Sequence, residues 1–463
     1  MFVETVKSDG LSHLSYLVGN GGEAVVIDPR RDCELYVQLA RARGCHITHV
    51  LETHRNEDLV SGAPVLARMT GAPVLHGPTP KHDIAYAKTV LENETLSLGS
   101  ARIRVIETPG HTDDSLSFVL QDTDFGDDPI GVFTGDALFV GDVGRTDFYP
   151  QRAREVAGLL FDSLRKLVAL GDQTIIYPAH GAGSVCGNNM ADREFSTLGY
   201  ERRNNPLLRM TDRDEFIATK LAEQHYQPPY FRLMEHLNSI GGEPVKRIMT
   251  PPSLSAFAFE HARAEAITID IRDVTAFMGA HLPDSLALPC DMVPAFAGWF
   301  LEQHQDILLV ADDAGQAEVA ARHLARIGFD RTVGFLVGAL AGWATGGRSF
   351  RTLPAVSVTE VARRVADSPE DWTLLDVRSA SEIAGGMITG SCHRYVGELG
   401  NHLDTLRHDH RYTVMCGSGQ RATIAASVLL RAGFSRVDVF LGSMGAWQAA
   451  GYPTIKAEDS ICQ

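Results

Sequence analysis

The chain has 463 residues, of which 44% are hydrophobic, and a formal net charge of −16 at pH 7. This length predicts two to four domains with ordinary hydrophobic cores. The acidic balance argues against nucleic acid or an anionic membrane as a partner. No apolar run is long enough to span a bilayer, and the first residues lack the basic and apolar regions of a signal peptide. The seven Cys are scattered and odd in number, which does not predict a disulfide framework, so we expect a cytoplasmic protein.

Strands and helices alternate over about the first 240 residues, which predicts an α/β layered architecture. The predicted elements are strands at residues 15–18 and 24–28, a helix at 35–43, and strands at 46–51, 103–106 and 131–133. Polar loops directly follow the last three of these strands. Loops at strand ends can converge at one edge of a sheet, and a site formed there can be exposed yet rigidly held.

The first of these loops reads T-H-R-N-E-D-L, which is the metal-binding pattern T-H-x-H-x-D-H with two His positions replaced. Asn56 stands at the second His position and Leu59 at the third. The later loops T-P-G-H-T and T-G-D-A supply His111 and Asp136, and the first loop keeps His54. Two imidazoles and one carboxylate leave coordination positions open, which suits non-heme Fe(II) and oxygen chemistry. The intact dinuclear set would suit zinc and hydrolysis.

A Gly- and Pro-containing linker from Gly241 to Pro252 separates this segment from an internal repeat. I-D-I-R in the first copy matches L-D-V-R in the second, and L-A-R-I-G-F matches L-L-R-A-G-F. Each copy alternates strands and helices and predicts a small α/β domain. We therefore expect three domains, at residues 1–242, 253–347 and 355–463.

The second copy contains C-G-S-G-Q-R, from Cys416 to Arg421, between a predicted strand and a predicted helix at 422–430. Glycines let successive backbone N–H groups point inward, and this nest at a helix N-terminus favours an anion. Cys416 is therefore expected to act as a thiolate nucleophile, and Arg421 to add a charge-assisted contact to an anionic substrate. In the first copy Asp312 and Ala317 stand at these two positions. We therefore expect that copy to adopt the same fold but to lack the sulfur chemistry of the second.

These motifs resemble the metallo-β-lactamase superfamily and, within it, the persulfide dioxygenases. The two repeats resemble rhodanese domains, of which the second carries the C-x-x-G-x-R loop. Chains with these three parts in this order are similar to CstB-type fusions. The resemblance implies an α/β fold in which a metallo-β-lactamase αββα sandwich is followed by two rhodanese-like α/β domains, a degenerate one and an active one.

The resemblance also implies the chemistry. One Fe(II) per chain would be held by His54, His111 and Asp136, and O2 would oxidise the outer sulfur of a small-molecule thiol persulfide to sulfite. Cys416 would carry a sulfane sulfur and transfer it to sulfite, giving thiosulfate in sulfide detoxification. The family further implies a homo-oligomer. The persulfide loop of the active rhodanese domain would consist of Gly417, Ser418, Gly419 and Gln420.

Four further residues are candidates for the surroundings of the metal or for substrate binding. We expect Asp58 and His180 to form hydrogen bonds around the metal rather than a second metal site, because Leu59 cannot help to bind one. Arg145 could bind an anionic group of the substrate or form a structural ion pair. Cys186, on a Gly-rich loop after His180, could touch substrate, form a redox pair or be a plain loop thiol. The cysteines other than Cys186 and Cys416 have no supporting context and are expected to be packing or surface residues.

Two other functions stay open. The first is a zinc-dependent, glyoxalase-II-like thioester hydrolase fused to a sulfur-carrier rhodanese, which Asn56 and Leu59 argue against. The second is a non-catalytic sulfur-carrier or binding module with a structural metal, which predicts persulfide loading of Cys416 without oxygen uptake. The middle domain is expected to serve as a spacer or docking surface.

Overall fold

The computed structural model describes residues 1–79, 83–187, 190–241 and 250–456. The chain divides into two compact units. The first consists of Met1–Ile248 with Ala325–Gly328, and the second of Met249–Leu324 with Phe329–Gln463. Residues 242–249 of the predicted linker lie outside the described residues.

Two six-stranded sheets form the centre of the first unit. The first sheet has the order β1 (Phe2–Ser8), β2 (His13–Asn20), β3 (Glu23–Ile27), β4 (His46–Leu51), β5 (Val74–His76) and β6 (Ala87–Thr89). The second has the order β12 (Ser196–Thr197), β11 (Ile175–Pro178), β10 (Pro129–Gly135), β9 (Leu116–Asp122), β8 (Ala101–Glu107) and β7 (Thr95–Leu98).

The two sheets pack face to face around one apolar core, to which Tyr16, Ile27, Phe118 and Phe133 contribute. The parallel strands β3, β4 and β5 are covered on both faces, which explains why β3 reads almost continuously apolar.

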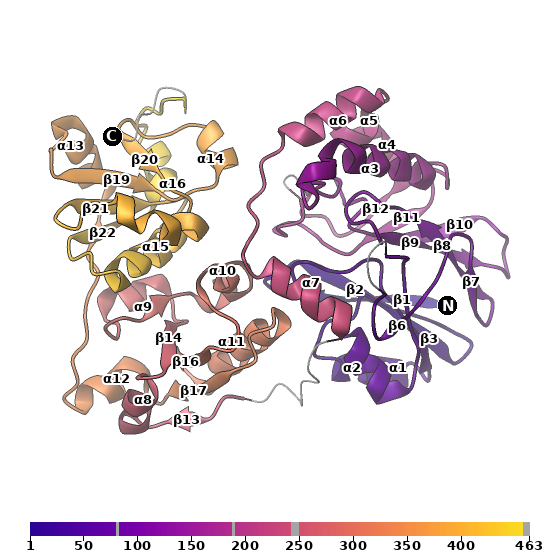
Figure 1. Ribbon diagram of the computed structural model, residues 1–463, viewed down its shortest axis with the longest axis horizontal. Coiled ribbons are helices and arrows are strands. Elements are labelled where there is room, and N and C mark those ends of the chain that lie inside the picture. The colour runs from indigo at the N-terminus through magenta and orange to yellow at the C-terminus, as the bar shows by residue number, and fades with distance from the viewer. Residues whose placement is uncertain (80–82, 188–189, 242–249, 457–463) are drawn as a thin grey trace. The chain divides into compact units, whose positions relative to one another are not determined.

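Helices cover the outer face of each sheet (Figure 1). The first sheet packs against α1 (Glu34–Ala42) and α2 (Ala63–Thr70). The second packs against α3 (Ala153–Val168), α4 (Leu198–Asn204), α5 (Pro206–Arg209) and α6 (Arg213–Ala222). The 3-10 helix η1 (Pro150–Arg152) precedes α3, and α7 (Phe231–Ile240) is the last described helix before the linker to the second unit. This arrangement confirms the predicted αββα sandwich.

Helix α3 illustrates why these segments fold as they do. Its buried residues Val156, Leu160, Leu164 and Leu167 recur at the spacing that places side chains on one face of a helix. That face packs on the second sheet beside Val132.

The second unit contains two five-stranded parallel sheets with the same strand order. The first repeat forms β13 (Ser253–Leu254), β17 (Thr332–Leu336), β16 (Asp306–Val310), β14 (Ala266–Asp270) and β15 (Leu286–Ala287). The second forms β18 (Ala355–Val356), β22 (Val437–Phe440), β21 (Arg411–Met415), β19 (Trp372–Asp376) and β20 (Ser391–His393).

Helices surround both sheets. Those of the first repeat are α8 (Ala256–Ala262), α9 (Val274–Gly279), η2 (Cys290–Met292), α10 (Val293–Phe300), α11 (Ala314–Arg326) and α12 (Ala339–Thr345). Those of the second are α13 (Val358–Asp367), α14 (Ala380–Ala384), η3 (Val396–Thr405), α15 (Gln420–Arg431) and α16 (Ser443–Ala449).

The repeated D-x-R motif has one structural role in both copies. Arg272 donates to both carboxylate oxygens of Asp270, at 2.8 and 2.6 Å, and Arg378 does the same to Asp376, at 3.0 and 2.7 Å. Both carboxylates are fully buried, so each needs its paired arginine. The sequence repeat therefore corresponds to a repeated buried ion pair at the end of β14 and of β19.

The predicted elements are confirmed, with small differences at their ends. The strand predicted at residues 46–51 is β4, the helix at 35–43 is α1 shifted by one residue, and the helix at 422–430 begins two residues earlier as α15. The sequence analysis does not predict β1, which pairs with β2 along its whole length.

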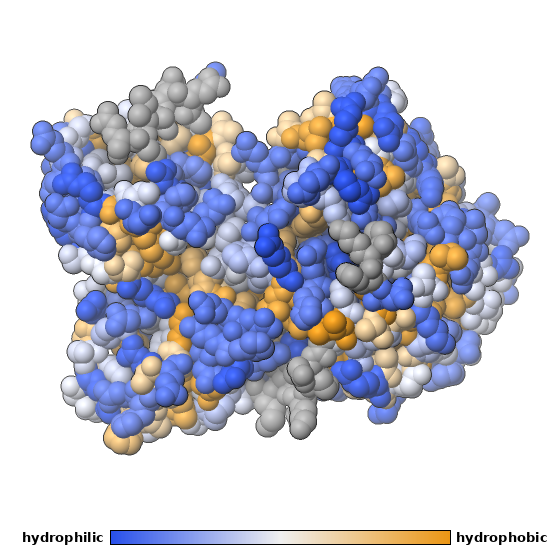
Figure 2. Space-filling view, viewed as in Figure 1, coloured by the Kyte–Doolittle hydropathy of each residue, from blue (hydrophilic) through white to orange (hydrophobic). Residues whose placement is uncertain are grey.

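The surface is largely polar on the face shown in Figure 2, with hydrophobic residues gathered in smaller patches. Among the residues that the structure describes, no helix combines the length and the apolar character required to cross a membrane.

Candidate functional site

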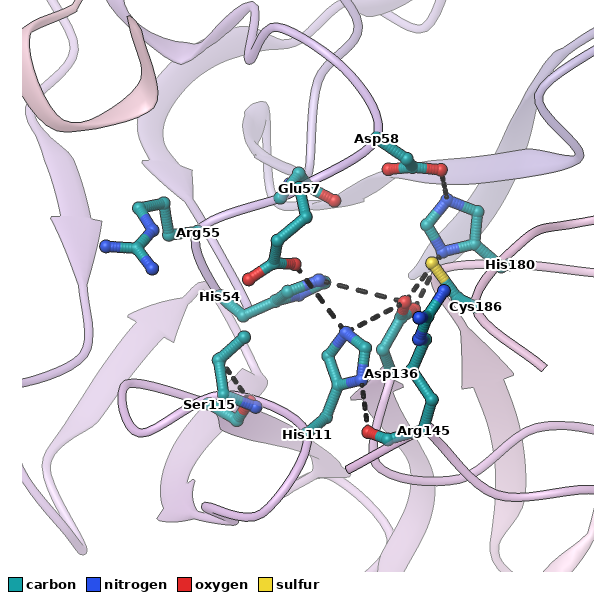
Figure 3. Close-up of polar contacts among 12 residues, drawn as sticks. His54, Arg55, Glu57, Asp58, His111, Ser115, Asp136, Arg145, His180 and Cys186 are labelled. Atoms are coloured by element: carbon teal, nitrogen blue, oxygen red, sulfur yellow. Dashed lines mark hydrogen bonds and ion pairs between the residues drawn. The ribbon is translucent and has the colours of Figure 1, made fainter. Parts of the chain in front are cut away.

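His54, His111 and Asp136 converge although they follow three different strands, β4, β8 and β10. One ligand atom from each lies within 4.8 Å of the others. His54 Nε2 is 3.8 Å and His111 Nε2 is 3.4 Å from Asp136 Oδ2 (Figure 3). Two atoms bound to one ion at about 2.1 Å are about 3.4 Å apart in a tetrahedral arrangement, so these distances fit a single metal ion. None of the three residues is more than 1% exposed, so the ligand side chains are buried.

Hydrogen bonds on the far side of each imidazole set the ring orientation. The Thr53 hydroxyl donates to Asp28 Oδ2 at 2.8 Å and therefore accepts from His54 Nδ1, at 2.9 Å. His111 Nδ1 donates to the carbonyl oxygen of Arg145 at 3.0 Å. Both rings thus turn Nε2 toward Asp136, as metal-binding histidines do.

The charges in the centre also suit a metal. Burial lowers the pKa of His111 to about 4 and lowers the pKa of His54, so both rings are neutral near pH 7. Burial alone would raise the pKa of Asp136, but His180 and the two other histidines hold it well below its usual range. Neutral imidazoles and an ionised carboxylate are the forms that bind metal ions.

Glycines permit the close approach of the loops. Gly110, directly before His111, has φ +137°, and a Cβ there would overlap the backbone of Leu160 in α3. Gly135 has φ +54°, and its Cβ would lie 2.7 Å from Thr53 Oγ1. Any side chain at these positions would push the His111 loop or the Asp136 loop away from its neighbours.

A second buried cluster adjoins the first. Ligand atoms of Asp58, His180 and Cys186 lie within 4.8 Å of one another. His180 Nδ1 donates to Asp136 Oδ1 at 2.8 Å, and its Nε2 lies 3.0 Å from Asp58 Oδ2. Although burial would lower the pKa of His180, the two carboxylates raise it well above its ordinary value. His180 thus lies between two carboxylates and is hydrogen-bonded to that of Asp136, while the buried Leu59 offers no ligand.

Arg145 is engaged in an ion pair. Its Nε and Nη2 donate to Asp147, both at 2.6 Å, and its Nη1 donates to the carbonyl oxygens of Val185 and Tyr226, both at 3.2 Å. Burial would raise the pKa of Asp147, but the bonds from Arg145 hold it at about 2. Of the two predicted roles for Arg145, these contacts favour the structural ion pair, which also anchors the loop that holds Cys186.

Cys186 is 2% exposed, and burial raises the pKa of its thiol well above the ordinary value. It is a free thiol, as are Cys33, Cys45, Cys290 and Cys416. Cys392 is disulfide-bonded. The scattered spacing of the cysteines gave no sign of this bond.

A cavity of about 300 Å³ opens on the side of this second cluster. His13 and His180 line its inner part, with ring centroids 5.4 Å apart. Lys7, Ser12 and Arg193 are among its other lining residues.

Glu57, which belongs to none of the predicted ligand positions, also directs its side chain at the centre. Its Oε2 lies 3.7 Å from His111 Nε2, and the residue is 2% exposed. Its place beside Asp58 in the loop was the only sign of this position in the sequence.

In the second unit, the loop after β21 curls around the sulfur of Cys416. The Gly419 N–H donates to Cys416 Sγ at 3.1 Å, and Gly419 has φ +115°, which favours glycine. The Cys416 N–H donates to Ser443 Oγ at 3.0 Å. The Gly445 N–H donates to the carbonyl oxygen of Gly417 at 2.9 Å. The start of α15 and the start of α16 therefore both hold the loop, and an N–H directed at sulfur favours negative charge there.

Arg421 does not extend freely toward a substrate. Its Nη1 and Nη2 donate to the two carboxylate oxygens of Glu382, at 2.6 and 2.7 Å. Burial would raise the pKa of Glu382, but the bonds from Arg421 and Ser379 hold it at about 2. In the first repeat Ala276 and Ala317 stand where Glu382 and Arg421 stand in the second, so both partners are absent there together.

An αββα sandwich with a buried His/Asp metal site at the ends of its strands defines a class of metal-dependent enzymes. The sequence pattern of the Metallo-beta-lactamase superfamily matches residues 8–180, and that of the Rhodanese-like domain matches residues 357–450. The chain belongs to the metallo-β-lactamase superfamily and carries a rhodanese-like domain in its C-terminal part.

Individual relatives support this membership. A solved structure of a metallo-beta-lactamase from Staphylococcus aureus subsp. aureus COL has 30% sequence identity and a TM-score of 0.66, over 73% of this chain and 98% of that chain. The hydroxyacylglutathione hydrolase of Rhodospirillum rubrum is 33% identical over 44% of this chain and 90% of the relative. The mitochondrial persulfide dioxygenase ETHE1 of Mus musculus is 31% identical over 44% of this chain and 74% of the relative. A hydrolase and a dioxygenase are thus similar to this chain at nearly the same identity.

Proposed function

We propose that the chain is a non-heme Fe(II) persulfide dioxygenase coupled to a rhodanese sulfurtransferase. The observation that carries this proposal is the set of His54, His111 and Asp136, with Asn56 and Leu59 at positions where a dinuclear site would need histidines. The first reaction would be RSSH + O2 + H2O → RSH + SO3²⁻ + 2 H⁺. In the second, the outer sulfur of a Cys416 persulfide would pass to sulfite, giving thiosulfate and the Cys416 thiolate.

Three domains would divide this work: a dioxygenase at residues 1–242, a degenerate rhodanese at 253–347 and an active rhodanese at 355–463. The shared strand order of the two C-terminal sheets supports the assignment of both as rhodanese domains. Asp312, at the position of Cys416, cannot carry a sulfane sulfur, which supports a non-catalytic role for the first copy.

The metal centre would depend on the residues around it. Iron(II) bound there would supply O2 activation at the coordination positions that two histidines and one carboxylate leave open. His180, between Asp58 and Asp136, holds the Asp136 carboxylate ionised and oriented. Phe148 stands edge-on to the His111 ring, with centroids 5.2 Å apart, and offers an apolar wall to the organic part of a thiol.

The sulfurtransfer step would take place at the N-terminus of α15. The backbone N–H groups of the loop and the positive end of the helix stabilise a negative charge on the Cys416 sulfur and on an incoming anion such as sulfite. Because Glu382 already neutralises Arg421, this backbone nest would provide most of the anion binding.

The test is oxygen uptake by anaerobically Fe(II)-loaded protein after addition of a small-thiol persulfide, with sulfite and thiosulfate quantified. Uptake should be rapid, should be abolished by His111→Ala, and should be unaffected by His46→Ala, an exposed histidine on β4. Cys416→Ser should keep oxygen uptake and accumulate sulfite in place of thiosulfate. No uptake with several persulfides despite bound iron would overturn the dioxygenase proposal, and an unchanged thiosulfate yield from Cys416→Ser would overturn the coupling.

The similarity to hydroxyacylglutathione hydrolase supports a second candidate, a zinc-dependent thioester hydrolase fused to a sulfur-carrier rhodanese. It predicts zinc in natively purified protein and hydrolysis of a glutathione thioester. Asn56 and Leu59 count against it, because they remove one candidate ligand from each of the two metal positions.

A further inference from the structure

Glu57 is a buried carboxylate without a hydrogen-bond partner. It is 2% exposed, and neither of its carboxylate oxygens accepts a hydrogen bond from any of the described residues. The neighbouring cation, Arg55, donates from Nη2 to Glu235 at 3.0 Å. Burying a carboxylate without a hydrogen bond or a bound cation is costly, and such a group in a native fold calls for a partner such as an ion.

The direction of the side chain shows where that partner would lie. Figure 3 shows the Glu57 carboxylate directed at the His111 ring, on the side of the centre away from Cys186. Its Oε2 is 3.7 Å from His111 Nε2, the same nitrogen that lies 3.4 Å from Asp136 Oδ2. Glu57 lies outside the group of ligand atoms that are all within 4.8 Å of one another, so binding the same ion would require its carboxylate to move further into the centre.

The position of Glu57 in the loop adds to this argument. It directly follows Asn56, which stands where the T-H-x-H-x-D-H pattern has its second histidine. Position 56 of the loop therefore has no imidazole, and position 57 has a buried carboxylate.

We propose that Glu57 is a fourth ligand of the metal, giving a centre with two histidines and two carboxylates. This inference rests on the metal centre of the proposed function but not on the identity of the metal. Two carboxylates balance the charge of a divalent ion, and four protein ligands leave two positions open in a six-coordinate site. The open positions would suffice for one substrate atom and one further small ligand.

Co(II) binding tests the proposal without any turnover. Apo-protein is titrated with Co(II) alone, and the affinity is measured by competition with a chelator while the visible absorption of the ion reports its ligands. Glu57→Gln keeps the size of the side chain and removes its charge. We expect it to weaken Co(II) binding at least about tenfold and to change the absorption bands. Glu235→Gln removes the charge of the nearby partner of Arg55 and should leave both properties as in the wild type.

Thermal melting of Glu57→Gln should differ from that of the wild type in opposite directions for the apo-protein and the Co(II)-bound protein. Removing an unpaired buried charge should leave the melting temperature of apo Glu57→Gln equal to or above that of the wild type. The increase in melting temperature on adding Co(II) should be smaller than in the wild type. A structural role for Glu57 would instead lower the melting temperature of the apo-protein and leave the Co(II)-induced increase unchanged.

The outcomes separate this inference from the proposed function. Absence of Co(II) binding to the wild type would overturn the metal centre itself. Wild-type binding with the same affinity and spectrum in Glu57→Gln would overturn only the role of Glu57. Glu57→Asp, which keeps the charge but shortens the reach, gives the same decision if Glu57→Gln does not fold: an unchanged spectrum and affinity would overturn the proposal.

Discussion

The ion pair between Arg421 and Glu382 gives the Cys416 loop a residue that sequence reasoning did not identify. Glu382 binds Arg421 through both carboxylate oxygens and accepts from the backbone N–H of Ser379 at the start of α14. Arg421 is therefore held by α14 and does not extend into solvent. Both partners are absent from the repeat that lacks the cysteine, so the repeated fold does not require the pair.

Glu382→Gln should lower the rate of sulfurtransfer roughly tenfold or more, because Arg421 loses its charged partner and its fixed position beside Gly417. The measurement is thiosulfate formation from sulfite by protein whose Cys416 has been loaded with sulfane sulfur. Glu370→Gln, an exposed position of the same repeat, serves as the control and should react as the wild type. Equal rates for both variants would show that the pair has no part in the reaction.

Cys186 should react slowly with iodoacetamide at pH 7.5, and faster as the pH rises. Burial raises the pKa of its thiol well above the ordinary value, so the reactive thiolate is scarce at neutral pH and increases only toward that higher pKa. Peptide mass spectrometry after timed labelling measures the rate against that of the half-buried Cys45. Labelling of Cys186 at pH 7.5 as fast as that of Cys45 would contradict this expectation.

At the scale of elements, the metal centre depends on how closely its loops approach α3 and each other. The His111 loop packs directly on the backbone of Leu160, and this contact is possible only because Gly110 has no side chain. Helix α3 in turn buries its apolar face against the second sheet. The packing of one helix thus determines where a candidate ligand lies.

Gly110→Ala should destabilise the protein by about 2 kcal/mol or more and reduce its metal content, because the added methyl group overlaps backbone and the backbone has φ +137°. Gly171→Ala is the matched control: Gly171 has φ +109° but nothing within 4 Å of its Cβ position, so only about 1 kcal/mol of backbone strain should appear. Urea unfolding and metal analysis of both variants measure the difference. Equal losses for the two would show that the contact with α3 is unimportant.

At the scale of the whole molecule, the two C-terminal repeats form one compact unit rather than two separate ones. The Ala287 N–H at the end of β15 donates to Ser427 Oγ of α15 at 3.0 Å. The ring of Trp299, from the first repeat, packs against Gly397, and its centroid lies 5.6 Å from that of Tyr395 in the second repeat. The first repeat thus contacts both α15, the helix that follows Cys416, and the segment around η3.

Trp299→Ala should therefore lower the temperature at which sulfurtransfer activity is lost. The expected destabilisation is about 2 kcal/mol, below the ~3–5 kcal/mol of a fully buried Trp, because Trp299 is only half-buried. Activity at low temperature should stay unchanged. The control is Phe257→Ala, which removes a 66% exposed ring from the same repeat and should have little effect. An unchanged inactivation temperature for Trp299→Ala would mean that the repeats do not stabilise one another.

The sequence by itself determined the α/β layered character of the first segment, the two repeated α/β sheets, and the convergence of His54, His111 and Asp136, while the αββα sandwich was implied by the family resemblance of the motifs. These features rest on local patterns: strand and helix periodicity, and side chains placed directly after strands. The sequence did not show that His54 follows a strand of the first sheet whereas His111 and Asp136 follow strands of the second. The sequence also shows that Asp312 and Ala317 stand at the positions of Cys416 and Arg421 in the first repeat, and the loss of chemistry there remains a prediction.

Only the tertiary structure decided which charged groups are partners. Arg421 could have faced an anion or any of many carboxylates, and its pairing with Glu382 depends on the packing of α14 beside α15. The sequence likewise left two roles for Arg145, a substrate contact or an ion pair. In the structure, Asp147 and the loop before Cys186 surround its guanidinium group. Glu57 is one acidic residue in a polar loop until folding buries it against His111. The physical reason is that a charged group pairs with whichever opposite charge is buried beside it. Which segments pack together is decided by the tertiary fold, and no local sequence pattern shows it.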